Sequence, residues 1–549
     1  MTKHSRLAAV ASLAASGLLV AVGSSSMAAA KTVPPLTVAF DYGSPLLLEN
    51  FNPFGTSNLS GYKYMFEPLY IVNDLNGRQT PALATSYHWG NSKELIFTMR
   101  SGVKWSNGQA LTAKDVAFTF NLLKKYPALD FNGLWPTLSS VTAKGNQVIF
   151  DFAKADVPDW FFIATTPILP ESQWAKVTNP VKFTDPSPVV SGPFKLARFT
   201  SRGYTLKPNP DFWLRSKVKI PEMQFMDLTS NTSTDLLLSE GKIDWATIFT
   251  PGIKKTYISR NPKYYHYWFP SGSAQVLYLN LTKPPFNQVK FRQALAYAIN
   301  RSSIALHGEY GYPKPANQAV VPPGIQKGLV PSALARKYAY AYSPRKALRL
   351  LAQLGYHKSP AGVLLNPKGK PVQFTLVGPS AYTDMIQDES IITQDLKAIG
   401  IKVTEVSTSV STWSNDYETG RYQMAMGFTD TYPNPWLTYN ALLNSNESAK
   451  IGQLAPSNYE RWNNKATDAA LSAYAETTKP AVQRRLMDQI ETTLFKDVPV
   501  ISLFYGPVWY EYQTNAYTGW PTPSNPYADP SNAYPDTLLM AIRVHPIAK

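Results

Sequence analysis

Strand-like and helix-like segments alternate along this chain of 549 residues. Near the C-terminus, Val482, Leu486, Ile490 and Leu494 recur every four residues, as apolar residues do on one face of a helix. The apolar run 498–505 follows and is typical of a buried strand. Because all-helical and all-β chains lack this alternation, the pattern predicts a mixed α/β fold.

Residues that favour a helix N-terminus predict two further helices in the sequence. Thr112 followed by Asp115 three residues later is the pattern of a capping box, and Val116 begins an apolar face after it. A second helix is expected over residues 287–299, with Asn287 as its N-cap, because its apolar residues are spaced as on one helical face. Both helices are expected to follow strands, which again favours α/β architecture.

The length of the chain predicts more than one domain, since a single hydrophobic core stops growing at roughly 250 to 300 residues. No repeat of about 20 to 50 residues occurs, and no long Gly/Ser linker separates one half from the other. The domains are therefore expected to interleave along the chain instead of following one another.

The N-terminus has the pattern of an export signal. Lys3 and Arg6 precede the apolar run 7–22, and small residues follow it. This run of about 16 residues is shorter than the ~20 that span a bilayer. We therefore predict a cleavable signal peptide over residues 1–30 and a mature chain that begins at Lys31, periplasmic or extracellular and associated with the cell envelope.

The chain has no cysteine. This excludes disulfides, thiolate nucleophiles and zinc sites built on cysteine. It also removes the thiol to which a bacterial lipid anchor is attached, so the protein is predicted not to be a lipoprotein.

The net charge is +16, which raises the possibility of a nucleic-acid partner. However, the Lys and Arg residues are spread along the chain, and no zinc-finger motif, RNP-type motif or basic block occurs. We therefore expect no nucleic-acid partner.

Common catalytic motifs are absent: the sequence contains no HExxH, GxSxG, GxxxxGKS/T or GxGxxG pattern. Its six histidines lie far apart and have no metal-ligand spacing. The sequence therefore predicts no enzyme activity, no catalytic residue, no metal site and no cofactor. A secreted glycoside hydrolase stays as a remote alternative, because two carboxylates suffice for that chemistry and the sequence does not give their separation.

Aromatic residues are abundant, with 13 Trp and 32 Tyr, and they concentrate in segments such as 264–269 and 509–512. A single aromatic residue is more often part of a hydrophobic core than of a binding site. Taken together, however, this many amphipathic rings favour a cleft that packs on sugar faces or peptide side chains.

Several blocks of residues resemble family 5 of bacterial extracellular solute-binding proteins. They cover nearly all of the expected mature chain in the order of the family, and they are 83–89, 102–108, 111–116, 191–194, 209–213, 285–301 and 396–413. The resemblance implies a periplasmic-binding-protein-like α/β fold, in which two lobes close around a ligand and an additional domain is inserted into the first lobe.

The resemblance also implies boundaries for these parts. Lobe I would comprise residues 31–69, 190–290 and 512–549. The inserted domain II would comprise residues 70–189, and lobe III residues 291–511. Such an arrangement would account for the interleaving expected from the sequence.

By the same resemblance, the protein would be the substrate-binding component of an ABC importer. It would capture oligopeptides and deliver them to the membrane permease, acting as a monomer without chemistry on the ligand. Oligosaccharide binding is the alternative within the family, because the ending around Trp520 is similar to members that bind oligosaccharides. Metal complexes are a third ligand class of the family.

The family resemblance finally implies ligand-binding residues. In segment 427–436, Asp430 matches the residue that accepts the terminal ammonium of a peptide, although Thr431 adds one residue compared with the family segment. A carboxylate is the natural partner of a partly buried ammonium. The other expected ligand-binding residues are aromatic: Trp413, Phe428, Trp436, Tyr278 and Trp509.

Overall fold

The computed structural model describes residues 33–40, 46–55, 57–228, 231–327, 329–380 and 382–547. The contacts separate residues 1–33 from a unit that extends from Pro34 to Lys549, and the description below concerns this unit. The predicted signal peptide over residues 1–30 lies outside the described residues.

One seven-stranded sheet collects three distant stretches of the chain. β1 pairs in parallel with β10 and β11, and the outer strands add in antiparallel fashion. In spatial order the strands are β12 (Tyr265–Tyr267), β20 (Glu511–Gln513), β11 (Trp245–Ala246), β1 (Leu36–Ala39), β10 (Met223–Met226), β9 (Gly203–Pro208) and β8 (Phe194–Thr200). Buried residues of α4 (Asn231–Ser239) and α5 (Ile253–Thr256) cluster with Ala39 and Ala246 of this sheet, and buried residues of α16 (Thr537–Arg543) belong to the same core as Leu36 and Val38.

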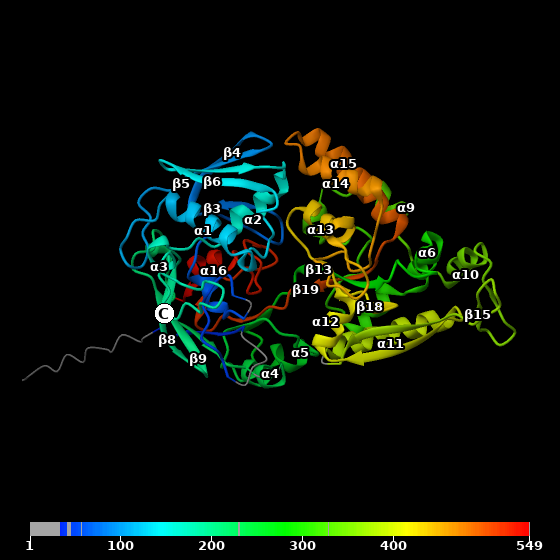
Figure 1. Ribbon diagram of the computed structural model, residues 1–549. Coiled ribbons are helices and arrows are strands. Elements are labelled where there is room, and N and C mark those ends of the chain that lie inside the picture. The colour runs from blue at the N-terminus through cyan, green and yellow to red at the C-terminus, as the bar shows by residue number, and fades with distance from the viewer. Residues whose placement is uncertain are drawn as a thin grey trace, which may run out of the picture. The chain divides into compact units, whose positions relative to one another are not determined.

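A five-stranded mixed sheet forms the second large layer (Figure 1). Its order is β17 (Lys402–Thr408), β16 (Gln373–Pro379), β18 (Met424–Phe428), β13 (Ser271–Leu279) and β19 (Ile501–Pro507). α11 (Thr383–Ala398) packs along β16 and β17. The other helices of at least nine residues in this part are α6 (Val289–Ala298), α10 (Pro344–Ala352), α12 (Val410–Glu418), α13 (Pro435–Leu443), α14 (Lys465–Ala475) and α15 (Pro480–Asp497).

A four-stranded antiparallel sheet is formed by residues that lie in the sequence between β1 and β8 of the seven-stranded sheet. Its order is β4 (Ala84–Asn91), β5 (Glu94–Met99), β7 (Gln147–Phe152) and β6 (Leu138–Lys144). α1 (Ala113–Lys125) packs on β6 and β7, and α2 (Trp160–Thr165) contacts β2 (Tyr70–Val72), which pairs with β3 (Gln79–Pro81). The predicted mixed α/β class is confirmed.

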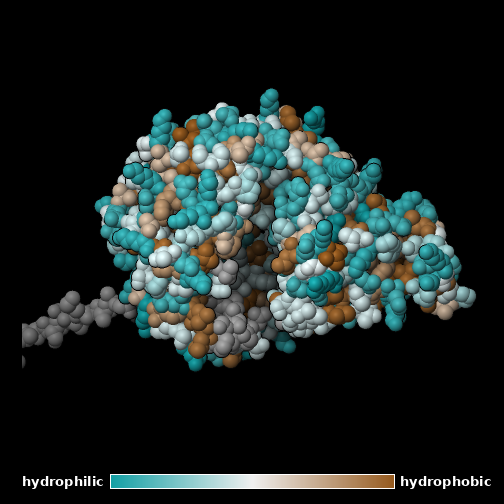
Figure 2. Space-filling view, viewed as in Figure 1, coloured by the Kyte–Doolittle hydropathy of each residue, from teal (hydrophilic) through white to brown (hydrophobic). Residues whose placement is uncertain are grey.

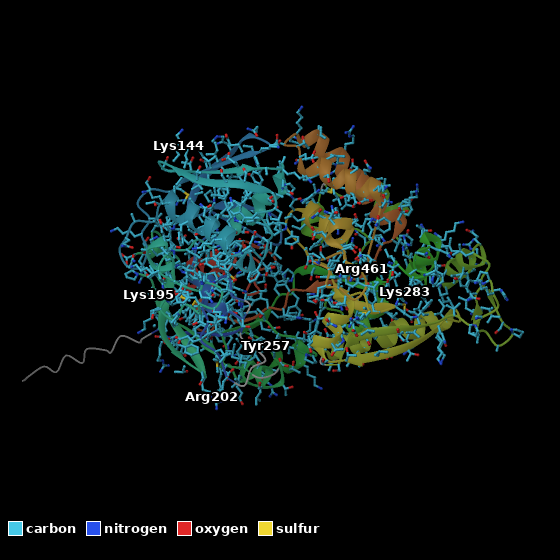
Figure 3. The ribbon with its side chains drawn as sticks, viewed as in Figure 1. Lys144, Lys195, Arg202, Tyr257, Lys283 and Arg461 are labelled. Carbon is cyan, nitrogen blue, oxygen red and sulfur yellow. The ribbon has the colours of Figure 1, made fainter. Side chains whose placement is uncertain are left out.

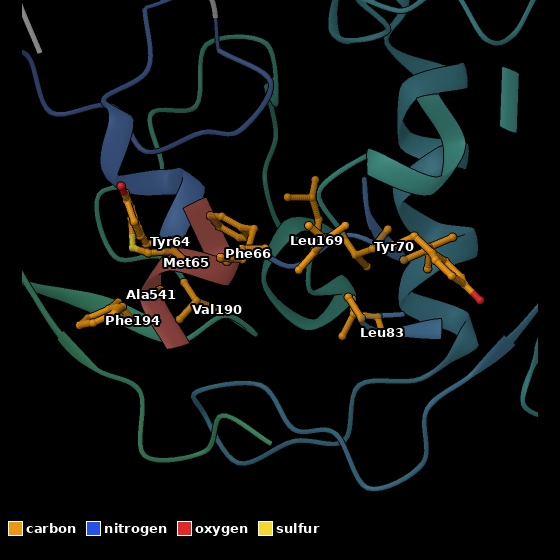
Figure 4. Close-up of a cluster of buried hydrophobic side chains, with 14 of the residues drawn as sticks. Tyr64, Met65, Phe66, Tyr70, Leu83, Leu169, Val190, Phe194 and Ala541 are labelled. Atoms are coloured by element: carbon orange, nitrogen blue, oxygen red, sulfur yellow. The ribbon is translucent and has the colours of Figure 1, made fainter. Parts of the chain in front are cut away.

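Two large hydrophobic cores stabilise these layers. In the first, side chains from distant parts of the chain pack together, as the close-up in Figure 4 shows for Phe66, Leu169, Val190 and Ala541. The second core contains β13 together with the strands and helices between residues 274 and 505. The first core is thus completed by segments on either side of the second in sequence, which is how this chain interleaves.

The predicted helix near the C-terminus is confirmed, but the strand after it is shifted. α15 contains the four apolar residues that predicted it. The strand β19 begins at Ile501, three residues later than expected, because Val498 adopts a left-handed conformation with φ of 47° and ends the helix before Pro499. The buried pattern of β19 agrees with the apolar run.

The prediction that Asn287 caps a helix is wrong. α6 begins at Val289 and its N-cap is Gln288, whose side chain makes no capping hydrogen bond. The amide of Asn287 instead donates to the carbonyl of Lys283, so the chain is still turning at this position. The apolar face of the helix is buried as expected.

The capping box at α1 is confirmed. The hydroxyl of Thr112 accepts from the amide of Lys114 at 3.2 Å, and the carboxylate of Asp115 accepts from the amide of Thr112 at 2.8 Å. We predict that Thr112→Ala lowers the free energy of unfolding by about 1 kcal/mol, because the helix loses its N-terminal partner. Urea denaturation measures this loss. An unchanged midpoint would show that the cap contributes nothing to stability. Thr112→Ser is the control, because serine keeps the capping hydroxyl and should keep the wild-type midpoint.

Hydrophilic residues cover most of the face seen in Figure 2, and hydrophobic residues are scattered among them. Across the described residues, no helix combines the length and the apolar character needed to cross a membrane.

Candidate ligand-binding cleft

Three neighbouring pockets surround the segment 428–432, which follows β18. The largest, called here the Asp430 pocket, has a volume of about 500 Å³. The Asp74 pocket, of about 330 Å³, shares Phe162 and Tyr432 with it. The Glu309 pocket, of about 140 Å³, contains Phe428. These three pockets are called the cleft below, and their volumes are in the range of sites for small ligands and their substituents.

The charged residues that line the cleft are all acidic. Among the residues that the structure describes, no Lys, Arg or His lines any of the three pockets, although the whole chain has a net charge of +16. Lysines and arginines such as Lys144, Lys195 and Arg202 lie on the outside (Figure 3). The acidic lining residues are Asp74, Asp130, Asp156, Asp159, Glu309, Asp384, Asp430 and Glu447. This distribution favours a positively charged ligand, because a cation stabilises the ionised form of the carboxyl groups.

Asp156 and Asp159 form an acidic pair in the Asp430 pocket, at the 3-10 turn Val157–Asp159. The hydroxyl of Thr137 donates to Asp159 at 2.6 Å and orients it. Burial raises the pKa of both carboxyl groups above the usual range, and Asp156 raises that of Asp159 further. A cation that enters the pocket would reverse this shift, because it favours the ionised carboxylates.

Asp430 lies two residues beyond the end of β18, across the Asp430 pocket from segment 156–162. The intervening residue, Thr429, is buried, and its amide donates to the carbonyl of Ala274 at 3.0 Å. This bond fixes the backbone beside Asp430. The carboxyl group is exposed to the pocket, yet the surrounding protein displaces enough water to raise its pKa.

Tyr432 joins the two sides of the cleft through aromatic contacts. Its ring lies edge-on to Phe161 and Phe162, with centroid separations of 5.9 and 5.5 Å. Its amide donates to the hydroxyl of Thr438 at 3.2 Å, and Thr431, the additional residue of this segment, lines the Asp74 pocket.

The expected aromatic residues fall into two groups. Trp436 lines the Asp430 pocket, while Phe428 and Trp509 line the Glu309 pocket. Trp413 and Tyr278 are buried behind them: Trp413 donates to the carbonyl of Met426 at 2.9 Å, and Tyr278 to that of Phe428 at 2.7 Å. The structure therefore brings Asp430, Phe428, Trp436 and Trp509 to pocket walls, and it uses the polar atoms of Trp413 and Tyr278 to hold β18.

Tyr278 also explains the glycine in β18. A Cβ atom at Gly427 would clash with the Tyr278 ring, so only glycine allows this close approach. The strand carrying Phe428 and leading to Asp430 is thereby held against β13, with which it pairs in antiparallel register.

Sequence reasoning missed most of the acidic residues of the cleft. Asp156 and Asp159 come from the region of the four-stranded sheet, Glu447 follows α13, and Asp384 begins α11. No spacing in the sequence links such distant segments, so the convergence becomes visible only in three dimensions.

The described residues contain no group of three or more His, Cys, Asp or Glu with the geometry to hold a metal ion.

Comparison with solved structures defines the class of protein. The structure aligns with the periplasmic oligopeptide-binding protein of an oligopeptide ABC transporter from Thermotoga maritima with a TM-score of 0.86 and 25% identity, covering 93% of this chain and 99% of that one. A mannohexaose-bound structure described by the same name aligns with a TM-score of 0.78 and 25% identity, covering 94% and 99%. The fold is that of a periplasmic binding protein, and the class is a solute-binding protein, not an enzyme.

The sequence identifies the family within that class. Residues 78–450 match the family described as bacterial extracellular solute-binding proteins, family 5 Middle, so the chain belongs to this family. It is the extracytoplasmic substrate-binding protein of an ABC importer. The nickel-binding periplasmic protein of Escherichia coli (strain K12) is 26% identical over 403 residues, which cover 69% of this chain and 73% of that protein. The glutathione-binding protein of Salmonella choleraesuis (strain SC-B67) is 24% identical, covering 62% and 63%.

Proposed function

We propose that this receptor captures oligopeptides in the cleft and that Asp430 binds the terminal ammonium of the ligand. The observation that carries the proposal is the acidic lining of the three pockets, in a protein with a large positive net charge. A free peptide always carries an ammonium group, and a carboxylate in a partly desolvated pocket is its strongest partner.

The two sides of the Asp430 pocket belong to different parts of the fold, which suggests how a ligand is captured and delivered. Asp430 and Trp436 belong to the region of the five-stranded sheet, whereas Asp156 and Asp159 belong to that of the four-stranded sheet. A ligand that contacts both sides stabilises a closed arrangement, and this arrangement is the one that the membrane permease of the importer engages.

The lobes of this proposal follow the family pattern, with domain II at residues 70–189, but one boundary moves. β13 (Ser271–Leu279) lies within the predicted lobe I segment 190–290, yet its hydrogen-bond partners are β18 and β19. Lobe III therefore begins near residue 270 in this proposal. Limited proteolysis that cuts near this position, and spares β13 together with β18, is the corresponding test.

Oligosaccharide binding is the second candidate. It is favoured by the aromatic side chains of the Asp430 pocket, Trp436, Tyr432 and Phe162, which are suited to packing on sugar faces. It is also favoured by the mannohexaose in the structure of the Thermotoga maritima protein. Neutral sugars, however, leave the many carboxylates of the cleft without charged partners.

We predict that Asp430→Asn weakens the binding of tetra-alanine about ten-fold or more, because the ammonium loses a charge-assisted hydrogen bond. Isothermal titration calorimetry measures the loss. N-acetylation of the same peptide should weaken binding to the wild-type chain as much, and should have little further effect on the variant.

Glu476→Gln is the matched control, since Glu476 is an exposed carboxylate at the C-terminal end of α14, outside the cleft. Equal affinity of the wild-type chain for free and acetylated tetra-alanine would contradict the role of Asp430.

A further inference from the structure

The Glu309 pocket is a small and separate part of the cleft. It lies between the start of β13, the end of β19 and the start of α11. Glu309 and Asp384 supply its charges, Gln275 supplies an amide, and Phe428 and Trp509 supply aromatic walls. Its volume of about 140 Å³ suits a side chain better than a whole ligand.

Two buried side chains in this pocket each have a polar atom without a hydrogen bond in the described protein, although the carboxyl group of Glu309 also interacts with that of Asp388. Gln275 is 2% exposed, and its amide nitrogen makes no hydrogen bond. Glu309 is also 2% exposed, and its Oε2 atom makes none. Buried polar groups are nearly always hydrogen-bonded, so these two atoms are available to a ligand group that enters the pocket.

The carboxyl groups around Glu309 indicate which charge a ligand group in this pocket would carry. Burial and then Asp384 raise the pKa of Glu309, and Asp388, fully buried beside them, has its own pKa raised by burial and by Glu309. The residues that line the pocket include no basic side chain. A positively charged group would relieve the repulsion among these carboxyl groups.

The aromatic walls of the pocket indicate the chemistry of the uncharged part of that ligand group. Trp509 is held edge-on against Phe269 and Phe249, with centroid separations of 4.8 and 5.3 Å, so its position is fixed. An aliphatic stem packs well between two rings, and a cation at its end adds attraction to their faces. The free amide nitrogen of Gln275 is a donor, which suits a carbonyl of a peptide backbone.

We propose that the Glu309 pocket binds a lysine or arginine side chain of the peptide, so that the receptor selects peptides with a basic residue at the first or second position. This inference rests on the proposed oligopeptide function. The positions follow from distance: Phe428 and Asp430 are two residues apart, so their Cα atoms are separated by at most about 7 Å. A peptide whose ammonium lies at Asp430 therefore brings its first two side chains close to Phe428.

The test compares five tetrapeptides by isothermal titration calorimetry: tetra-alanine, the two peptides with lysine at the first or second position, and their counterparts with Nε-acetyl-lysine. Acetylation keeps the stem and removes the charge. We expect one lysine peptide to bind about ten-fold tighter than its acetylated counterpart. The preference, measured as the ratio of the affinities for the lysine peptide and its acetylated counterpart, should disappear in Glu309→Gln and in Asp384→Asn.

Asp384 is only partly buried, so Asp384→Asn keeps the test open if Glu309→Gln does not fold. Glu240→Gln, an exposed carboxylate that pairs with Lys242, is the control and should keep the preference. Equal affinity for all five peptides, or a preference that survives both variants, would overturn this inference and leave the oligopeptide function intact. Failure of every peptide to bind would overturn the oligopeptide function and this inference with it.

Discussion

Replacement of Arg292 by methionine is expected to lower the free energy of unfolding by about 3–5 kcal/mol. Arg292 lies on α6 and is 2% exposed. Its guanidinium donates to the carbonyls of Asp497 and Val498 at 3.0 and 2.8 Å, and to that of Phe286 at 2.8 Å. Methionine fills much of the volume but leaves these carbonyls buried without a donor.

The loss is large because Arg292 closes the C-terminal end of α15. Carbonyls at the C-terminal end of a helix have no hydrogen-bond partner within the helix. The guanidinium supplies these hydrogen bonds, and its positive charge is favourable at this end. Urea denaturation of the mature chain measures the effect as a shift of the midpoint at constant slope. Lys290→Met removes a charge from an exposed position of the same helix and should change stability little. A loss below 1 kcal/mol for Arg292→Met would contradict this account.

Stability is expected to fall as the pH rises from about 4.5 to 8. Burial raises the pKa of Glu309 in the cleft from 4.5 to about 8, and it does the same to four nearly inaccessible glutamates outside the cleft, Glu67, Glu389, Glu460 and Glu491. Between these two values the folded chain keeps a proton that the unfolded chain releases. Each group therefore lowers the free energy of unfolding as the pH rises through this interval, and has no further effect above pH 8.

Thermal unfolding at pH 5, 6, 7 and 8 measures the trend. Glu491 tests its origin best, because both of its carboxylate oxygens lack a hydrogen-bond partner among the described residues. Glu491→Gln should raise the melting temperature at pH 8, leave it nearly unchanged at pH 5 and reduce the slope between them. The control Glu476→Gln, at an exposed position, should follow the wild-type curve. A melting temperature that rises steadily from pH 5 to 8 would show that these glutamates are ionised in the folded chain.

The sequence predicted those features that depend on local physics. The capping box of Thr112 and Asp115 lies within four residues, so its geometry follows directly from the pattern. The apolar face of α15 is visible for the same reason. The prediction that Asn287 is an N-cap was wrong, because a residue suited to capping also suits the turn that precedes a helix. The sequence does not distinguish these two positions.

The cleft was predicted only in part, because its residues come from segments far apart in the chain. Asp430 was found through the family resemblance, and the structure places it on a pocket wall. Asp156, Glu309 and Asp384 carry no local signal that separates them from surface carboxylates. The aromatic predictions mixed two roles: Phe428 and Trp509 line a pocket, whereas Trp413 uses its indole nitrogen to bind the backbone of β18. Trp436 does both, since it lines the Asp430 pocket and its indole nitrogen donates to the carbonyl of Leu471.

The most direct test of the central proposal is a thermal-shift measurement on the mature chain, from Lys31 onward, with tetra-alanine, the two lysine-containing tetrapeptides and mannohexaose. A ligand at a hundred times its Kd adds about 2.7 kcal/mol to the stability of its receptor. The account predicts that peptides raise the melting temperature, that lysine-containing peptides do so at lower concentration, and that mannohexaose leaves it unchanged. A shift with mannohexaose alone would contradict it and would make the receptor one for oligosaccharides.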